Sequence, residues 1–188
     1  MRLFLGVFPP PAARALAART IDALRTPNDG VSWVKEENLH YTMRFIGEVG
    51  EDGAKRVEQA ADEAASGVAA FDAVLGDLGA FPSVRKARVI WVGLTSGGEA
   101  LSGLAARLAD ALEKRGWERE RQKFQAHLTL GRVREPNRDW GPAFASAPPV
   151  GAEPAGQFRV DQLLVIHSQL NPKGSIYTVR HSAALAER

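Results

Sequence analysis

The chain has 188 residues, of which 45% are hydrophobic and 24% are charged, and this composition excludes a disordered or fibrous protein. It contains no cysteine, which excludes disulfides, a thiolate nucleophile and cysteine-ligated zinc, and no apolar run approaches the roughly 20 residues needed to span a bilayer. We therefore expect one compact domain over residues 1–188, in the cytoplasm and without a membrane partner, whose net charge of +2 is too small by itself to indicate nucleic-acid binding.

The first half of the chain is predicted to alternate strands and helices. Its elements, in order, are a strand over 2–8, a Pro-initiated helix over 11–24, extended runs over 31–34 and 40–46, and a helix over 51–66. The last of these begins with acidic residues, which the helix dipole favours.

The second half repeats this plan loosely. Its predicted elements are strands over 69–78 and 88–94, an amphipathic helix over 98–115, a strand over 124–133, and final strands over 157–168 and 175–182 that meet at the turn 171–174. Residues 136–154 are rich in Pro, Gly and Ala and are expected to form a connection. The pattern favours an α+β fold with a largely antiparallel sheet.

One short pattern, H-x-T-apolar, occurs twice, as HYTM over residues 40–43 and HLTL over residues 127–130. Each copy falls in a predicted strand, where side chains alternate between two faces, so its histidine and threonine project to the same side. One copy lies in each half of the chain, which suggests a pseudo-twofold site built from two similar lobes.

In-line displacement at phosphorus needs a base beside the attacking oxygen and an acid beside the leaving oxygen. Two histidines suit these roles, because their ordinary pKa of roughly 6.5 lets one ring be neutral while the other is protonated. Thr42 and Thr129 could donate hydrogen bonds to the phosphate oxygens. A structural interpretation stays open, in which both histidines bond to backbone and the threonines serve strand formation.

The sequence resembles the bacterial and archaeal RNA 2′,3′-cyclic phosphodiesterases, also called 2′-5′ RNA ligase-like proteins, of the two-histidine phosphoesterase superfamily. The resemblance covers nearly the whole chain and rests on the two motifs and the segments around them, at residues 2–7, 31–35, 45–49, 79–82, 89–93, 124–132, 168, 174 and 177. It implies a bilobal α+β fold in which two pseudo-symmetric lobes, each with an antiparallel sheet and helices, face each other across an active-site cleft.

The resemblance also implies the chemistry and its residues. The family opens terminal RNA 2′,3′-cyclic phosphates to 2′-phosphates without metal or cofactor, and some members reversibly join tRNA halves through a 2′-5′ linkage. Carried over to this chain, His40 is the proton donor and His127 the proton acceptor, Thr42 and Thr129 hold the phosphate, and Arg132, Phe45 and Tyr177 bind substrate. A monomer is expected.

Three other functions remain open. The chain could hydrolyse a different 2′-5′ or small cyclic phosphodiester, or it could be a non-catalytic module that binds RNA ends. A histidine metal site ranks last, because no acidic cluster or H-E-x-x-H pattern accompanies either motif. The charged run 118–123 is interpreted as a solvated approach to the second motif, and Trp91 as a core residue.

Overall fold

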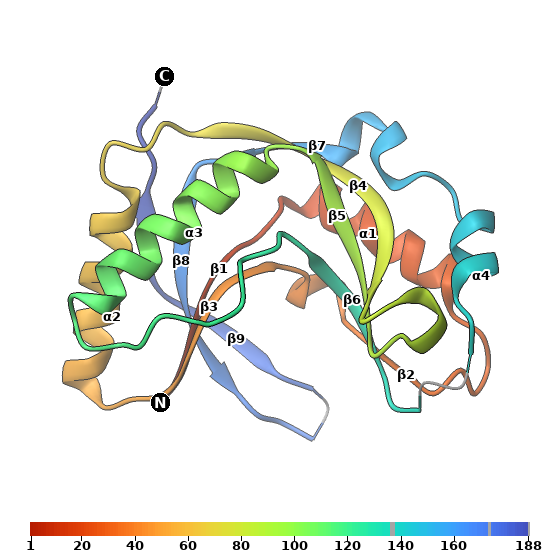
Figure 1. Cartoon of the computed structure of the whole chain (residues 1–188), viewed down its shortest axis with the longest axis horizontal. Coiled ribbons are helices and arrows are strands. Elements are labelled where there is room, and N and C mark those ends of the chain that lie inside the picture. Colours follow the sequence, from red (N-terminus) through yellow and green to blue (C-terminus); the bar gives the residue numbers. More distant parts are fainter. Residues whose placement is uncertain (136–137, 173, 188) are drawn as a thin grey trace.

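The computed structural model describes residues 1–135, 138–172 and 174–187, and nine strands within these ranges form one sheet in which neighbouring strands run antiparallel (Figure 1). The strand order is β7-β4-β5-β6-β3-β1-β8-β9, and β2 pairs with β6 off this path. The α+β class expected from the sequence is confirmed.

The sheet divides into two lobes. The first contains β1 (Arg2–Val7), β3 (Tyr41–Glu48), β8 (Gln162–Gln169) and β9 (Ile176–Ala184), and helices α2 (Glu51–Ala65) and α3 (Gly98–Glu113) lie over it (Figure 1). The second contains β2 (Val31–Trp33), β4 (Phe71–Phe81), β5 (Val89–Ser96), β6 (Leu128–Val133) and β7 (Gln157–Val160), with α1 (Pro11–Leu24) and α4 (Gly141–Ser146) on its side of the molecule (Figure 1). Short 3₁₀ turns complete the chain at Glu36–Asn38, Val84–Lys86, Val150–Ala152 and Pro154–Gly156.

Periodicity explains why these helices cover the sheet. In α3 the leucines at positions 101, 104, 108 and 112 recur at helical spacing and are each 1% exposed, as the sequence pattern predicted. In α2 the buried face is mostly alanine, and such small side chains let α2 pack directly against α3. None of the helices in the described part of the chain is long and apolar enough to cross a membrane.

The two lobes are joined where β3 meets β6 through the pair Tyr41 and Leu128. Both side chains are almost completely buried and point into the core. Continuing the antiparallel register by one residue on either side sets His127 beside Thr42, and His40 beside Thr129. Because side chains alternate along a strand, these four residues lie on the face opposite the core.

The structure corrects several predicted boundaries. Both motif histidines lie one residue before their strands, since β3 begins at Tyr41 and β6 at Leu128, so the strand predicted over 124–133 is shorter. The strand predicted over 157–168 is interrupted at Asp161, because β7 pairs with β4 in one lobe and β8 pairs with β1 in the other.

The connection predicted over 136–154 contains α4, preceded by Trp140, which is 1% exposed and packs edge-on against Trp33 with ring centroids 5.9 Å apart. Residues 136 and 137 of that connection, and Lys173 of the predicted turn, lie outside the described residues. The remaining turn residues agree with the prediction, since the Gly174 amide donates to the Asn171 carbonyl at 2.9 Å.

Candidate active site

His40 is fixed by a hydrogen bond at each ring nitrogen. Nδ1 lies 2.7 Å from the backbone carbonyl of Asn38, and because a carbonyl only accepts, Nδ1 carries the hydrogen. In the neutral ring Nε2 therefore has the lone pair, and the Thr42 hydroxyl donates to it at 2.9 Å. The first motif thus holds its histidine in one tautomer, with Nε2 beside the threonine.

Aromatic rings enclose the His40 imidazole. Phe8 stacks on it at 5.0 Å between centroids with an 18° tilt, Phe4 lies at 4.7 Å, and Tyr177 meets it edge-on at 5.4 Å. Gly6 leaves room for the ring, because a Cβ there would stand 3.4 Å from His40 Cδ2 and 3.0 Å from the Tyr41 carbonyl oxygen.

This enclosure lowers the pKa of His40 to about 4, from an ordinary value of 6.5. Burial is the largest cause, because it disfavours the charged form, and the positive charges of His127 and Arg132 act in the same direction. The hydrogen bond to the Asn38 carbonyl opposes both effects. Near neutral pH the His40 ring is therefore uncharged and its Nε2 is a base.

His127 repeats the arrangement of the first motif in a more open setting. Its Nδ1 lies 2.8 Å from the backbone carbonyl of Gln125 and so carries the hydrogen, which leaves Nε2 with the lone pair in the neutral ring. Phe81 meets the ring edge-on at 5.1 Å, and Trp91 lies 6.5 Å away between centroids. Both histidines bond to backbone through Nδ1, as the structural interpretation held, and in neither does Nε2 bond to backbone, since Nε2 of His40 accepts from the Thr42 hydroxyl.

A cavity of about 810 Å³ lies along the junction of the lobes. Five of the predicted site residues line it: Thr42, Phe45, His127, Thr129 and Arg132. His40 joins them through its hydrogen bond to Thr42. Phe45 is 56% exposed, a large apolar ring presented to solvent at the edge of this cavity.

Tyr177 lies apart from this group. Its ring meets the His40 ring edge-on, and it lines a cavity other than the one that contains Thr42 and His127. Burial raises the pKa of its phenol, while a hydrogen bond with the Ser175 side chain and the charges of Arg132 and Arg2 act against that rise.

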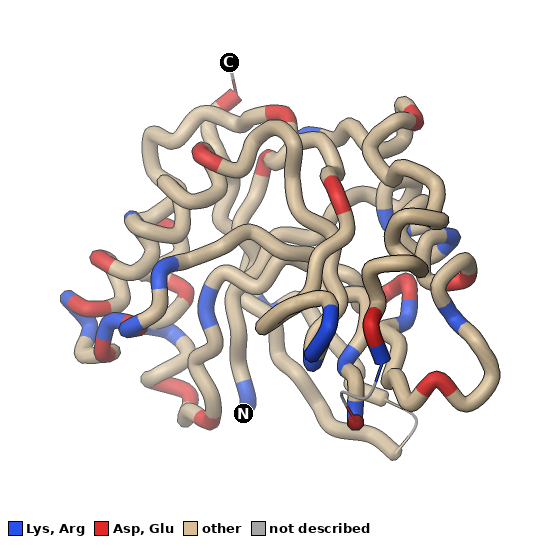
Figure 2. The backbone as a smooth tube through the Cα atoms, turned by 45° about the vertical axis from the view of Figure 1, so that its right-hand side comes forward, with Lys and Arg blue, Asp and Glu red and all other residues tan. Residues whose placement is uncertain are grey.

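The segment 118–123 is exposed along its length, in agreement with its interpretation as a solvated approach, and Glu120, Arg121, Gln122 and Lys123 also line the cavity. Arg44 of β3 holds it there, since its guanidinium donates to the Glu118 carbonyl and its Nε lies 3.6 Å from the Glu120 carboxylate. Along the whole chain, basic and acidic positions are mixed (Figure 2). Any local excess of positive charge therefore comes from particular side chains, such as that of Arg132 in the cavity.

The family model for LigT-like phosphoesterases matches this chain twice, over residues 7–91 and 92–177, with one H-x-T motif in each stretch. The chain belongs to the LigT-like phosphoesterase family. It is 34% identical over 182 residues to the RNA 2′,3′-cyclic phosphodiesterase of Methanothermobacter thermautotrophicus, with 95% of both chains covered. It is also 34% identical to the RNA 2′,3′-cyclic phosphodiesterase of Archaeoglobus fulgidus, over 94% of this chain and 96% of that one.

Solved structures support the same family fold. A protein from Thermus thermophilus superposes with a TM-score of 0.79 at 29% identity, covering 98% of each chain. Escherichia coli LigT complexed with NADP+ superposes with a TM-score of 0.78 at 26% identity, covering 98% of this chain and 96% of that one. The two-lobed architecture expected from the resemblance is therefore that of the LigT-like family.

Sequence patterns did not reveal the residues that shape each histidine's surroundings in this LigT-like chain. Phe4 and Phe8 enclose His40, and neither was singled out. Trp91 was assigned to the core, but it is partly exposed beside His127. Its indole lies over Gly79, where an added Cβ would stand 2.3 Å from the ring. A glycine opposite an aromatic residue on a neighbouring strand is the signal that could have found it.

Among the described residues, no three His, Asp or Glu side chains come together as a group that could hold a metal ion.

Proposed function

We propose that this protein is an RNA 2′,3′-cyclic phosphodiesterase that opens the cyclic phosphate at an RNA end to a 2′-phosphate. The observation that carries the proposal is the register at the lobe junction, which sets each motif's histidine beside the other motif's threonine. The names of the relatives from Methanothermobacter and Archaeoglobus support the substrate class. The cavity of about 810 Å³ is large enough for a nucleotide.

The two histidines divide the proton transfers. Nε2 of His127 takes a proton from water as the water oxygen attacks phosphorus, and the bond from phosphorus to O3′ breaks. Nε2 of His40, when protonated, gives its proton to O3′. The products are a 2′-phosphomonoester and a free 3′-hydroxyl, and the next substrate requires that His40 regain a proton and His127 lose one.

The remaining site residues hold charge and orient the substrate. The Thr42 and Thr129 hydroxyls and the Arg132 guanidinium line the cavity together, where they would donate to the non-bridging oxygens. The exposed Phe45 ring would stack on the terminal base. Tyr177 would help to hold the His40 imidazole in position through its edge-on contact with that ring.

Protonation of His40 also changes the role of Thr42. In the neutral site the Thr42 hydroxyl donates to Nε2 of His40. A protonated Nε2 no longer accepts, so the hydroxyl hydrogen becomes free to turn toward a phosphate oxygen. Protonation of His40 therefore also frees the Thr42 hydroxyl to donate a hydrogen bond to the phosphate.

The resting pKa of about 4 means that His40 must gain its proton when the anionic substrate binds. We expect the His40 titration, followed by NMR of the imidazole Cε1–H, to have its midpoint near pH 4 in the free protein. Addition of adenosine 2′-monophosphate should raise that midpoint, because the phosphate charge offsets the repulsion from His127 and Arg132. His40→Gln identifies the resonance, and a midpoint at the ordinary value of 6.5 in the free protein would contradict this account.

Joining of RNA ends would use the same groups. If the 5′-hydroxyl of a second strand replaces water, His127 takes its proton and the product is a 2′-5′ linkage, so we include reversible ligation of RNA ends, such as tRNA halves, in the proposal.

Hydrolysis should survive chelation, because the proposal assigns both proton transfers and the charge stabilisation to side chains. An RNA oligomer ending in a 2′,3′-cyclic phosphate is incubated with the protein in EDTA, and the position of the product phosphate is determined. We expect undiminished turnover and a 2′-phosphate.

Activity lost in EDTA and restored by a divalent ion would remove the mechanism. Tight binding of the RNA end without turnover would make the protein an end-binding module, and turnover of other cyclic phosphodiesters alone would change the substrate.

A further inference from the structure

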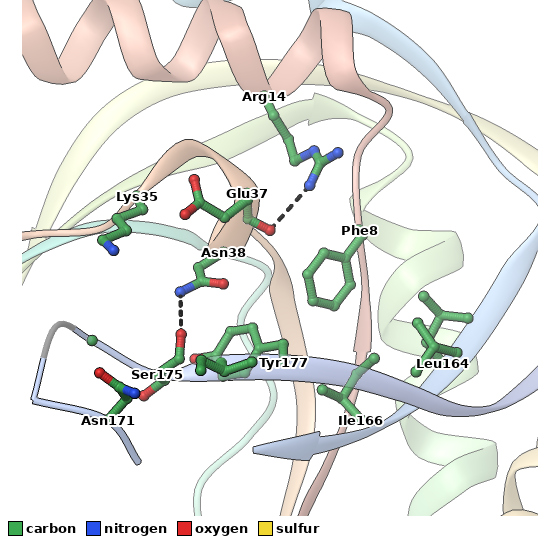
Figure 3. Close-up of a pocket in the computed structure, with 13 residues that line it drawn as sticks. Phe8, Arg14, Lys35, Glu37, Asn38, Leu164, Ile166, Asn171, Ser175 and Tyr177 are labelled. Atoms are coloured by element: carbon green, nitrogen blue, oxygen red, sulfur yellow. Dashed lines mark hydrogen bonds between the residues drawn. The ribbon is translucent and has the colours of Figure 1, made fainter. Parts of the chain in front are cut away.

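A second cavity, of about 510 Å³, is lined in part by Phe8 and Tyr177 (Figure 3), the two aromatic rings that also contact His40. It is bounded by α1, by the turn Glu36–Asn38, and by the hairpin of β8 and β9. Its volume falls within the range of ordinary small-molecule sites.

The floor of this cavity is apolar and partly open to solvent. Leu164 and Ile166 of β8, with Phe8 and Tyr177 beside them, face it (Figure 3). Ile176 and Val179 of β9 extend the apolar surface, and they are 50% and 56% exposed. Exposed aliphatic side chains next to two aromatic rings form a surface on which a flat ring can lie.

Two cations stand above this floor. Arg14 of α1 reaches the Glu37 backbone carbonyl, to which Nη1 donates at 3.0 Å, and its Nε has no partner among the described residues. Lys35 extends toward the hairpin turn, near Gly174. Within the described ranges neither has a carboxylate partner, and Glu37, with one negative charge, is the acidic residue that lines the cavity.

The cavity shares its inner wall with the proposed active site. Asn38 belongs to both: its carbonyl accepts from Nδ1 of His40, and its amide donates to the Ser175 carbonyl at 2.9 Å (Figure 3). Phe8 and Tyr177 contact the His40 ring and also line the cavity. The two cavities therefore adjoin across the His40 ring, and an RNA strand that continues from the terminal ribose over Phe8 or Tyr177 would reach the second cavity.

We propose that this second cavity binds the penultimate nucleotide of the RNA strand, the one joined through its phosphate to the nucleotide that carries the cyclic phosphate. Its base lies on the apolar floor, and Arg14 and Lys35 contact the phosphate between the two nucleotides. An aromatic and aliphatic floor under cations that have no carboxylate partner in the described ranges matches a base joined to a phosphate. The inference rests on the proposed function and extends it from a terminal nucleotide to a dinucleotide end.

The test compares adenosine 2′,3′-cyclic phosphate with the dinucleotide ApA that ends in the same cyclic phosphate. We expect kcat/KM to be about tenfold higher for the dinucleotide, as one charge-assisted phosphate contact provides. Lys35→Met and Val179→Glu, both at exposed positions, should each remove most of that advantage and leave hydrolysis of the mononucleotide unchanged. Glu37→Gln should preserve or increase the advantage, and Lys55→Met, on the exposed side of α2, is the matched control.

The outcomes separate the two proposals. Equal kcat/KM for both substrates in the wild-type protein, unaltered by the variants, overturns the subsite and leaves the proposed function intact. An equal loss for both substrates in Lys35→Met and Val179→Glu also overturns it, because the residues would then act through His40. If neither substrate is hydrolysed, the proposed function fails, and calorimetric binding of 2′-phosphorylated ApA to wild type and Lys35→Met tests the subsite alone.

Discussion

Replacing either His40 or His127 by alanine should lower the rate of RNA 2′,3′-cyclic phosphate hydrolysis by about 10²- to 10⁴-fold, the range for loss of a general acid or base. The double variant should be little slower than the slower single variant, because an acid and a base that act in one displacement contribute as a unit. Initial rates at saturating and limiting substrate measure both effects.

A matched control is available in His181, which lies on β9 and bonds to the Asp62 carboxylate at 2.7 Å, away from the cavity. His181→Ala should retain the wild-type rate. Binding of adenosine 2′-monophosphate should persist in the His40 and His127 variants, since Thr42, Thr129 and Arg132 remain. Near-normal hydrolysis with weakened RNA binding in those two variants would make the cavity a binding site and not a catalytic one.

Thr42→Ala and Thr129→Ala should each lower the rate by about 10²-fold, which is typical of losing one hydrogen-bond donor to a developing oxyanion. The two should differ in a second property. Thr42 donates to His40 Nε2, so Thr42→Ala should alter the NMR titration of His40 and Thr129→Ala should leave it nearly unchanged.

Thr42→Ser should recover most of the rate, because it restores the hydroxyl and removes only a methyl group. Thr178→Ala, at an exposed position on β9, is the control for threonine loss on a strand. Wild-type rates in both alanine variants would assign the motif threonines to strand formation alone.

Helical and strand periodicity in the sequence correctly predicted the helices and the side-chain alternation that depend on neighbouring residues alone. The helix over 11–24 was predicted with both ends correct, since Pro11 sets its first turn and its apolar spacing is helical. The buried leucines of α3 were likewise predicted. The shared face of each motif's histidine and threonine follows from strand alternation, which persists although the histidines precede their strands.

Tertiary pairing determined the features that were missed. The run 157–168 looks like one strand because no glycine or proline interrupts it, yet its two parts pair with different lobes and separate at Asp161. The aromatic enclosure of His40 joins β1, β3 and β9, segments far apart in the sequence, and no local pattern marks such a contact. Tyr177, which the resemblance associated with substrate, contacts the His40 ring and lines the second cavity, and this position too depends on tertiary pairing.

The single pair between Tyr41 and Leu128 has a consequence for how accurately the two histidines can be kept in position. A slip of β6 by one residue against β3 would turn every side chain of the slipped strand to its opposite face, bringing His127 toward the core and Leu128 into water. Leu128 is fully buried, so such a slip would expose apolar surface and desolvate an imidazole at once. Burial in the hydrophobic core therefore disfavours registry errors that would misalign the two histidines, even when no substrate is bound.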